Sequence, residues 1–162
     1  MNTTVKADIP TLTTAADTFS SAIEGIKHMD GLVRSLTLQP YPISPLEKCI
    51  SEGGNCTGLD PADGPLVSVL LLLYWNNASE DKVILRVTRG ILKTIERDAA
   101  SRGQAVPFVY LNYAFDFQDP IGSYGAANQG LLRETSKKYN PEGIFQKGVP
   151  GGFKVSSEAG FT

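Results

Sequence analysis

The chain has 162 residues, of which 20% are charged and 41% are apolar, and its formal net charge at pH 7 is −2. This is the length of one ordinary domain, and it suffices to bury a core without metal or disulfide staples. The acidic balance argues against non-specific binding to nucleic acid or to an anionic membrane surface, because both need a basic field. With a single histidine and two cysteines, Cys49 and Cys56, a zinc site and a disulfide framework are also disfavoured.

No segment of the sequence is typical of export or of membrane insertion. Residues 1–14 are rich in threonine and contain no continuous apolar stretch, unlike a signal peptide. The longest mainly apolar run without a charge, residues 66–75, is shorter than the roughly 20 residues that a transmembrane helix needs. We therefore expect a cytoplasmic protein. Its cysteines are more simply explained as two thiols, although a bridge between Cys49 and Cys56 stays open.

The first third of the chain alternates strand and helix signals. Residues 3–7 are a weak, β-branched strand candidate that Pro10 closes. Apolar side chains then recur at helical spacing over residues 15–26, and Thr11, Thr13 or Thr14 is available as the cap. Residues 32–38 alternate in the manner of a strand, which we expect Pro40 and Pro42 to end.

The middle of the chain repeats this order. After a short helix at 45–51 and a glycine-rich loop at 52–65, the apolar run 66–75 predicts a central strand buried on both faces. An apolar stripe at spacings of three and four predicts a helix over 83–99, with Ser79 as a cap before it and Gly103 as its left-handed end. Residues 108–113, β-branched and aromatic, predict a last strand.

This order of elements predicts an α+β fold, a ferredoxin-like antiparallel sheet with helices on one face. We assign residues 1–118 to that ferredoxin-like domain and residues 119–162 to a C-terminal helix and tail that packs on it or extends from it. In the tail, Asp119 and Pro120 suit the start of a helix that runs from about 121 to 139, and residues 144–155 look irregular and rich in glycine.

The clearest motifs lie between residues 107 and 155. They are YLNYA at 110–114, QDPI at 118–121, SYG at 123–125, KKYNPEGIFQ at 137–146 and VPGGFK at 149–154. In these motifs the chain resembles the C-terminal, substrate-side (berberine-like) part of fungal berberine-bridge-type FAD-linked oxidoreductases. A weaker similarity extends upstream through residues 31–33 and 63–65, so the resemblance spans nearly the whole chain.

The resemblance implies a domain whose sheet covers a flavin ring and carries the substrate pocket. Full-length members bind FAD through an earlier domain, often covalently, and nothing in this sequence matches the flavin-linking motif. The family's Tyr-x-Asn-Tyr segment meets cofactor and substrate, and its positions fall on Tyr110, Asn112 and Tyr113. An extended strand would place Tyr110 and Asn112 on one face and Tyr113 on the other, so one pocket would require a bend.

Tyr110 and Asn112 are the candidate catalytic residues, because a phenol can move a proton and an amide can orient a carbonyl or enol. The alternative is that both are fold residues inherited from a flavin-binding ancestor. The candidate substrate-binding residues are Tyr113, Trp75, Tyr74, Phe115 and Asp116, and for Tyr113 and Trp75 a role in the core competes. Asp119 reads as a helix cap, His28 as a solvated residue and Gly151-Gly152 as no more than a superficial phosphate cradle.

Two functions follow from the resemblance. The first is a flavin-independent cyclase or isomerase of fungal secondary metabolism, including a pericyclic step, because a pocket without flavin cannot transfer a hydride. The second is a substrate-side subunit or fragment of an FAD-linked oxidoreductase that needs a separate flavin domain. We expect a small-molecule substrate, no metal, no FAD unless a partner supplies its domain, and either a homodimer or a flavin-domain partner.

Overall fold

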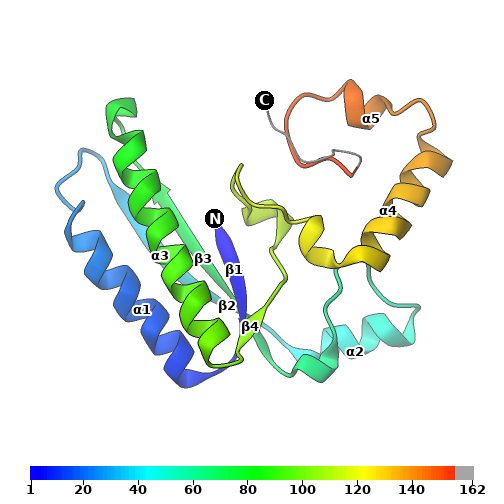
Figure 1. The fold of residues 1–162 in the computed structure, drawn as a ribbon, viewed down its shortest axis with the longest axis horizontal. Coiled ribbons are helices and arrows are strands. Elements are labelled where there is room, and N and C mark those ends of the chain that lie inside the picture. The colour runs from blue at the N-terminus through cyan, green and yellow to red at the C-terminus, as the bar shows by residue number, and fades with distance from the viewer. Residues whose placement is uncertain (156–162) are drawn as a thin grey trace.

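A computed structural model describes residues 1–155 of the chain, and its centre is a four-stranded antiparallel sheet with the order β2-β3-β1-β4. The strands are β1 (Asn2–Lys6), β2 (Val33–Tyr41), β3 (Leu66–Tyr74) and β4 (Ala105–Val106). The helices are α1 (Ile9–Glu24), α2 (Ile43–Ser51), α3 (Asp81–Ser101), α4 (Ala126–Tyr139) and α5 (Ile144–Lys147). The order β1-α1-β2-β3-α3-β4 confirms the α+β, ferredoxin-like prediction (Figure 1).

Helices α1 and α3 cover one face of the sheet and form the main core with it. Every second residue of β3, namely Val67, Val69 and Leu71, points into this core, which also contains Ile91 and Ile95 of α3. Helix α1 begins earlier than predicted because Asp8 is the cap residue, and its Oδ2 accepts a hydrogen bond from the Thr11 amide at 3.0 Å.

Strand β2 continues to Tyr41, so the prediction that Pro40 ends it is wrong. Strand β2 is an edge strand, which is where a sheet tolerates a proline. The extension pairs Tyr41 with Leu66 and therefore carries a tyrosine to the end of the sheet. No helix within residues 1–155 is long and apolar enough to cross a membrane.

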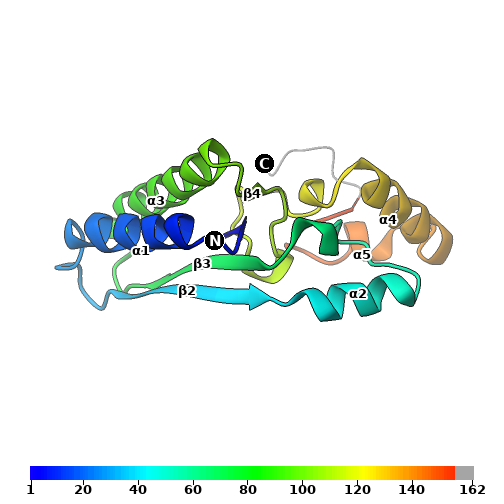
Figure 2. The ribbon, with the colours of Figure 1, turned by 90° about the horizontal axis from the view of Figure 1, so that it is seen from below.

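The face of the sheet opposite α1 and α3, called the second face below, is covered at only one end. Leu66, Ser68 and Leu70 of β3 point toward it and are buried, whereas Leu72 and Tyr74 are 39% and 61% exposed. The prediction of a strand buried on both faces is therefore right only for the first part of β3. Figure 2 shows α1 and α3 above the sheet, with no helix beneath β2 and β3.

The predicted strand over 108–113 is wrong, because β4 ends at Val106 and the chain leaves the edge of β1 at Pro107. Residues 111–113 instead form a short 3₁₀ helix. Helix α3 begins at Asp81 and has no side-chain cap. A 3₁₀ turn precedes it, and the side chain that caps this turn is that of Asn77 rather than Ser79. Gly103 has φ 68°, which confirms the predicted left-handed end of α3.

The C-terminal helix starts five residues later than predicted. The Asp119 carboxylate accepts a hydrogen bond from the Gly122 amide at 2.8 Å in a turn that leads into a 3₁₀ helix, while α4 begins at Ala126. Leu132 of α4 packs on the second face together with Tyr124 and Phe108. The division at residue 118 stays a prediction, and residues 156–162 of the predicted tail lie outside the described part.

Candidate functional site

The segment after β4 is attached to the edge of β1 through the side chains of Asn2 and Gln118. Asn2 is fully buried; its Nδ2 donates to the Tyr110 carbonyl at 3.0 Å, and its Oδ1 accepts from the Tyr110 amide at 2.9 Å. The Gln118 amide in turn accepts from the Asn2 backbone N–H at 3.2 Å and donates to the Asn2 carbonyl at 2.7 Å. Side chains thus replace the backbone ladder beyond the end of β4 at Val106, and they fix where Tyr110 lies.

The 3₁₀ helix that follows brings the three residues of the Tyr-x-Asn-Tyr segment together. Asn112 Nδ2 donates to the Tyr110 hydroxyl at 2.9 Å, and the rings of Tyr110 and Tyr113 meet edge to face at 4.9 Å between centroids. The prediction that Tyr113 points away from Tyr110 and Asn112 is therefore wrong, because it assumed an extended strand. Asn112 is exposed and both tyrosines are half-buried, so their polar groups can be reached from solvent.

Tyr110 and Tyr113 belong to a larger group, the tyrosine cluster, which also contains Tyr41 and Tyr124. Phe108 lies at its base: its ring is stacked on Tyr124 at 5.8 Å and meets the edge of Tyr41 at 6.0 Å. Tyr41 comes from the end of β2 and Tyr124 from the turn before α4. Three separate segments of the chain thus contribute four phenol groups to one end of the second face.

Two buried hydroxyl groups lie on the same face. Thr4 and Ser68 pair directly across β1 and β3 and are 1% and 0% exposed. Neither Thr4 Oγ1 nor Ser68 Oγ makes a hydrogen bond of normal geometry with any described residue. Ser68 still interacts with the Tyr41 hydroxyl, and this interaction lowers the pKa of Tyr41 by less than burial raises it. Unpaired buried hydroxyls are uncommon in folded proteins, and they add polar character to this face.

The surroundings raise the pKa of two phenols of the cluster, those of Tyr41 and Tyr124. Burial raises the pKa of Tyr41, and the nearby phenols of Tyr110, Tyr113 and Tyr124 raise it further. Burial also raises the pKa of Tyr124, with smaller contributions from Cys56 and Tyr110. At neutral pH the cluster therefore presents O–H donors and an amide rather than a strong base.

The remaining predicted substrate-binding residues lie elsewhere. Trp75 packs in the core beneath α1 and α3, where its Nε1 donates to Asp81 at 2.7 Å. Tyr74 is on the second face but at the exposed end of β3. Phe115 and Asp116 precede Gln118 in a loop that turns toward α3. The structure therefore groups Tyr110, Asn112 and Tyr113, and leaves Trp75, Tyr74, Phe115 and Asp116 outside the cluster; their roles stay predictions.

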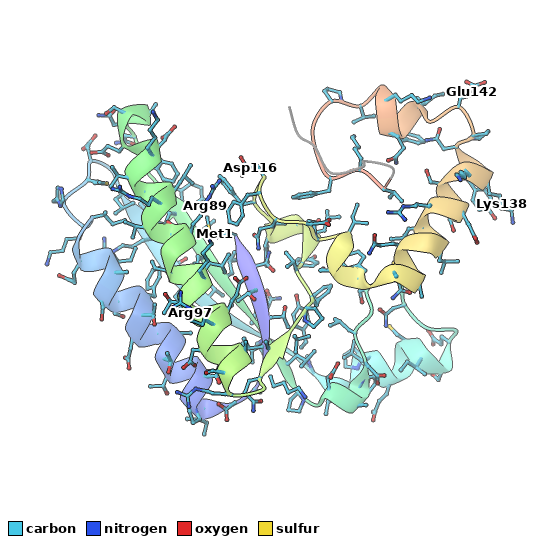
Figure 3. The ribbon with its side chains drawn as sticks, in the orientation of Figure 1. Met1, Arg89, Arg97, Asp116, Lys138 and Glu142 are labelled. Carbon is cyan, nitrogen blue, oxygen red and sulfur yellow. The ribbon has the colours of Figure 1, made fainter. Side chains whose placement is uncertain are left out.

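Arg89 of α3 holds the loop that contains Phe115 and Asp116. Its guanidinium lies 3.5 Å from the Asp116 carboxylate and 4.2 Å from the centroid of the Phe117 ring. Figure 3 shows Arg89 and Asp116 on facing segments near Met1. Asp116 is therefore part of a contact between the loop and α3 rather than a free acid beside the tyrosines.

The sequence interpretation missed Tyr41, Tyr124, Ser68 and Asn2 as members of the site. A signal for Tyr41 was present in the sequence. If the two-residue alternation of β2 is continued past Pro40, Tyr41 lies on the same face as the even-numbered residues of β3. The other three depend on contacts between distant segments. His28 is exposed, and no group of three or more possible metal ligands occurs among the described residues.

Comparisons with known proteins find partial matches to larger fungal enzymes. The chain is 32% identical over 157 residues to the FAD-dependent monooxygenase FUP4 of Fusarium proliferatum, covering 94% of this chain and 30% of that protein. It is 39% identical over 104 residues to the FAD-dependent monooxygenase drtC of Aspergillus calidoustus, covering 64% and 20%. It is 34% identical over 133 residues to the bifunctional solanapyrone synthase of Alternaria solani, covering 82% and 25%.

The chain therefore spans less than a third of the length of these relatives. No family model matches the sequence, and no solved structure matches it. The chain is a partial match to larger FAD-linked enzymes, and the activity of a whole relative does not pass to it directly.

The comparisons do not assign FAD binding to this chain, because it covers less than a third of each relative. A dinucleotide needs cations or backbone N–H groups around its pyrophosphate. The basic groove of this chain is lined by Lys82, Arg86, Arg89 and Lys93 of α3, on the helix side of the sheet, whereas the tyrosine cluster is on the second face. The basic groove and the tyrosine cluster therefore lie on opposite sides of the sheet.

Proposed function

We propose that the tyrosine cluster binds the oxygen of a small unsaturated carbonyl compound and promotes its cyclisation or isomerisation without a flavin. Such a reaction rearranges the bonds of one molecule and needs no oxidant or reductant. The observation that carries the proposal is the group of protonated phenols and an amide on the second face. Hydrogen-bond donors of this kind polarise a carbonyl and stabilise the charge that develops on its oxygen in the transition state.

The pair of Tyr110 and Asn112 is the most suitable donor arrangement in the cluster. Because Asn112 donates to the Tyr110 hydroxyl oxygen, the phenol keeps its own proton available for a ligand. A hydrogen bond accepted by the oxygen also strengthens the donor on the same hydroxyl. The ring of Tyr113, edge to face with Tyr110, offers an apolar surface against which a polyene can fold into one reactive conformer.

The test compares Tyr110→Phe and Asn112→Ala with the wild-type chain on a linear polyene ketone that carries a pendant alkene. Removal of one such donor is expected to slow product formation about 10- to 100-fold, a conservative figure for a preorganised donor. Tyr139→Phe is the matched control, because Tyr139 is 74% exposed on α4 and outside the cluster. If the wild-type chain accelerates the reaction and both cluster variants match it, the assignment of this site fails.

A second candidate function is the substrate-side part of a berberine-bridge-type FAD-linked oxidoreductase, completed by a separate flavin domain. The partial coverage of relatives named FAD-dependent supports it. So does an uncovered apolar strip on the second face, where Val33, Leu72 and Tyr74 are 63%, 39% and 61% exposed. In this arrangement the strip contacts the flavin domain and the tyrosine cluster positions the substrate. The same strip also supports the alternative of a homodimer.

An absorbance spectrum separates the two candidates. The purified chain is measured alone, after addition of FAD, and after copurification with the flavin domain of a relative such as FUP4. A yellow complex that forms only with the flavin domain supports the second candidate. A colourless chain that elutes without the flavin domain and still converts the polyene ketone supports the first. A homodimer would elute at twice the mass of the chain in size-exclusion chromatography.

A further inference from the structure

The early end of β4 leaves a cleft on the other side of the molecule, between α3 and the edge of β1. Strand β1 extends to Asn2, but β4 pairs with it only at Thr4 and Val5, and the chain leaves the sheet at Pro107. The opening has a volume of about 310 Å³. Its lining consists of Thr3, Thr4, Val5, Glu96, Ala99, Ala105, Val106, Pro107 and Val109. We call it the Glu96 cleft.

Glu96 is the one ionisable side chain in this lining. It comes from α3 and is half-buried among mainly apolar neighbours. Burial raises the pKa of its carboxyl group, and a hydrogen bond with Thr3 and the charge of Lys93 only partly oppose this effect. Within the described chain, Glu96 forms no ion pair at 4.0 Å or less. A partly desolvated carboxylate without a contacting cation is energetically unfavourable, and a cationic partner would lower that cost.

We propose that the Glu96 cleft binds a small alkylammonium ligand. The ammonium head would contact the Glu96 carboxylate and the Thr3 hydroxyl, and so supply that cationic partner. The hydrocarbon body would cover the accessible apolar side chains of the lining, which are those of Ala105, Pro107 and Val109. A mainly apolar cleft with a few convergent polar groups is the usual form of a small-molecule site.

The chemistry of the lining decides against other ligands. An anion would be repelled by the carboxylate, and the only cation acting on Glu96 from its own helix is Lys93, which is exposed. A neutral alcohol could hydrogen bond but would leave the charge without a counter-ion. None of the four tyrosines lines the cleft, although Val106 of its lining also packs with Phe108 and Tyr124 at the base of the tyrosine cluster. This inference therefore does not rest on the proposed function.

The test uses cyclohexylammonium and cyclohexanol, which have the same ring and differ in the charge of the head group. Binding is followed by the ¹H–¹⁵N chemical shifts of the intact chain. We expect saturable shifts at Thr3, Ala99 and Ala105 with cyclohexylammonium, and at least tenfold weaker binding of cyclohexanol. Glu96→Gln keeps the size of the side chain and should weaken cyclohexylammonium binding at least tenfold. Glu134→Gln, an exposed position on α4, is the matched control and should bind as the wild type does.

The proposal is overturned if both probes bind the wild-type chain equally well, or if neither binds. It is also overturned if Glu96→Gln binds cyclohexylammonium as the wild type does, or if the shifts fall outside the cleft. The comparison of the two probes needs only the wild-type chain, so the test remains decisive even if Glu96→Gln does not fold.

Discussion

Replacing Asn2 by alanine should be among the most destabilising changes of a polar residue in this chain. The Asn2 side chain is buried, and it forms the only two hydrogen bonds that join β1 to the backbone of Tyr110 among the described residues. Asn2→Ala removes both bonds, and it leaves the Tyr110 N–H and C=O without those partners. The change therefore acts directly on the residue that anchors the candidate site.

The magnitude follows from these two bonds. A hydrogen bond lost to water costs about 0.5–1.5 kcal/mol, and a backbone group left buried and unpaired costs about 1–3 kcal/mol. Tyr110 is half-buried, so water can reach part of its backbone. We expect Asn2→Ala to lower the free energy of unfolding by about 2–4 kcal/mol, between the limits that these two costs set for two groups.

Urea unfolding followed by far-UV circular dichroism measures this loss, and near-UV dichroism reports the packing of the tyrosine rings. Asn77→Ala is the control: Asn77 is exposed and caps a 3₁₀ turn, so its loss should cost no more than about 1 kcal/mol. A loss below about 0.5 kcal/mol for Asn2→Ala, with an unchanged denaturant slope, would refute the reasoning, since it would mean that the two bonds contribute little.

Two further predictions concern the cluster and the loop beside it. The phenol pKa values of Tyr41 and Tyr124 are raised in the folded state. Below pH about 10 both phenols are protonated in the folded and the unfolded chain, so the free energy of unfolding should not depend on them. Above that pH the unfolded chain loses its phenol protons first, so the free energy of unfolding should fall. A titration of the phenolate absorbance at alkaline pH measures the two pKa values, and Tyr41→Phe should reduce the loss of stability above pH about 10. Arg89→Ala should cost about 1 kcal/mol, mainly through the lost stacking on Phe117, whereas Asp116→Asn should cost less than about 0.5 kcal/mol, because that ion pair is largely exposed. Urea unfolding of both variants checks the order, and an equal loss in the two would contradict it.

The fold was predictable from the sequence because its main elements follow local rules. The apolar stripe of α3 and the apolar run of β3 specify a helix and a buried strand by periodicity alone. The ends of the strands were less predictable near prolines, because the sequence does not show how a proline is oriented in the sheet. Pro40 lies within the edge strand β2, whereas β4, the other edge strand, ends one residue before Pro107, and no local pattern distinguishes the two.

The candidate site was only partly predictable, for a physical reason. Tyr110, Asn112 and Tyr113 were identified through the family resemblance, but their grouping depends on the 3₁₀ helix after Pro107. The attachment of Tyr110 by Asn2 joins residues 108 positions apart, and a period-based reading contains no information about such a contact. The partners of the site thus come from tertiary structure.

The departure of the chain from the sheet at Pro107 accounts for both of the sites proposed here. A β4 continued to residue 113 would keep Tyr113 on the opposite face from Tyr110 and would fill the edge of β1 where the Glu96 cleft opens. Because the strand stops at Val106, the free segment folds into the 3₁₀ helix on the second face and leaves the cleft on the helix side. The two sites differ in chemistry, since one presents protonated phenols and the other a carboxylate. A neutral carbonyl ligand and a cationic ligand should therefore bind to opposite faces of the sheet without competing.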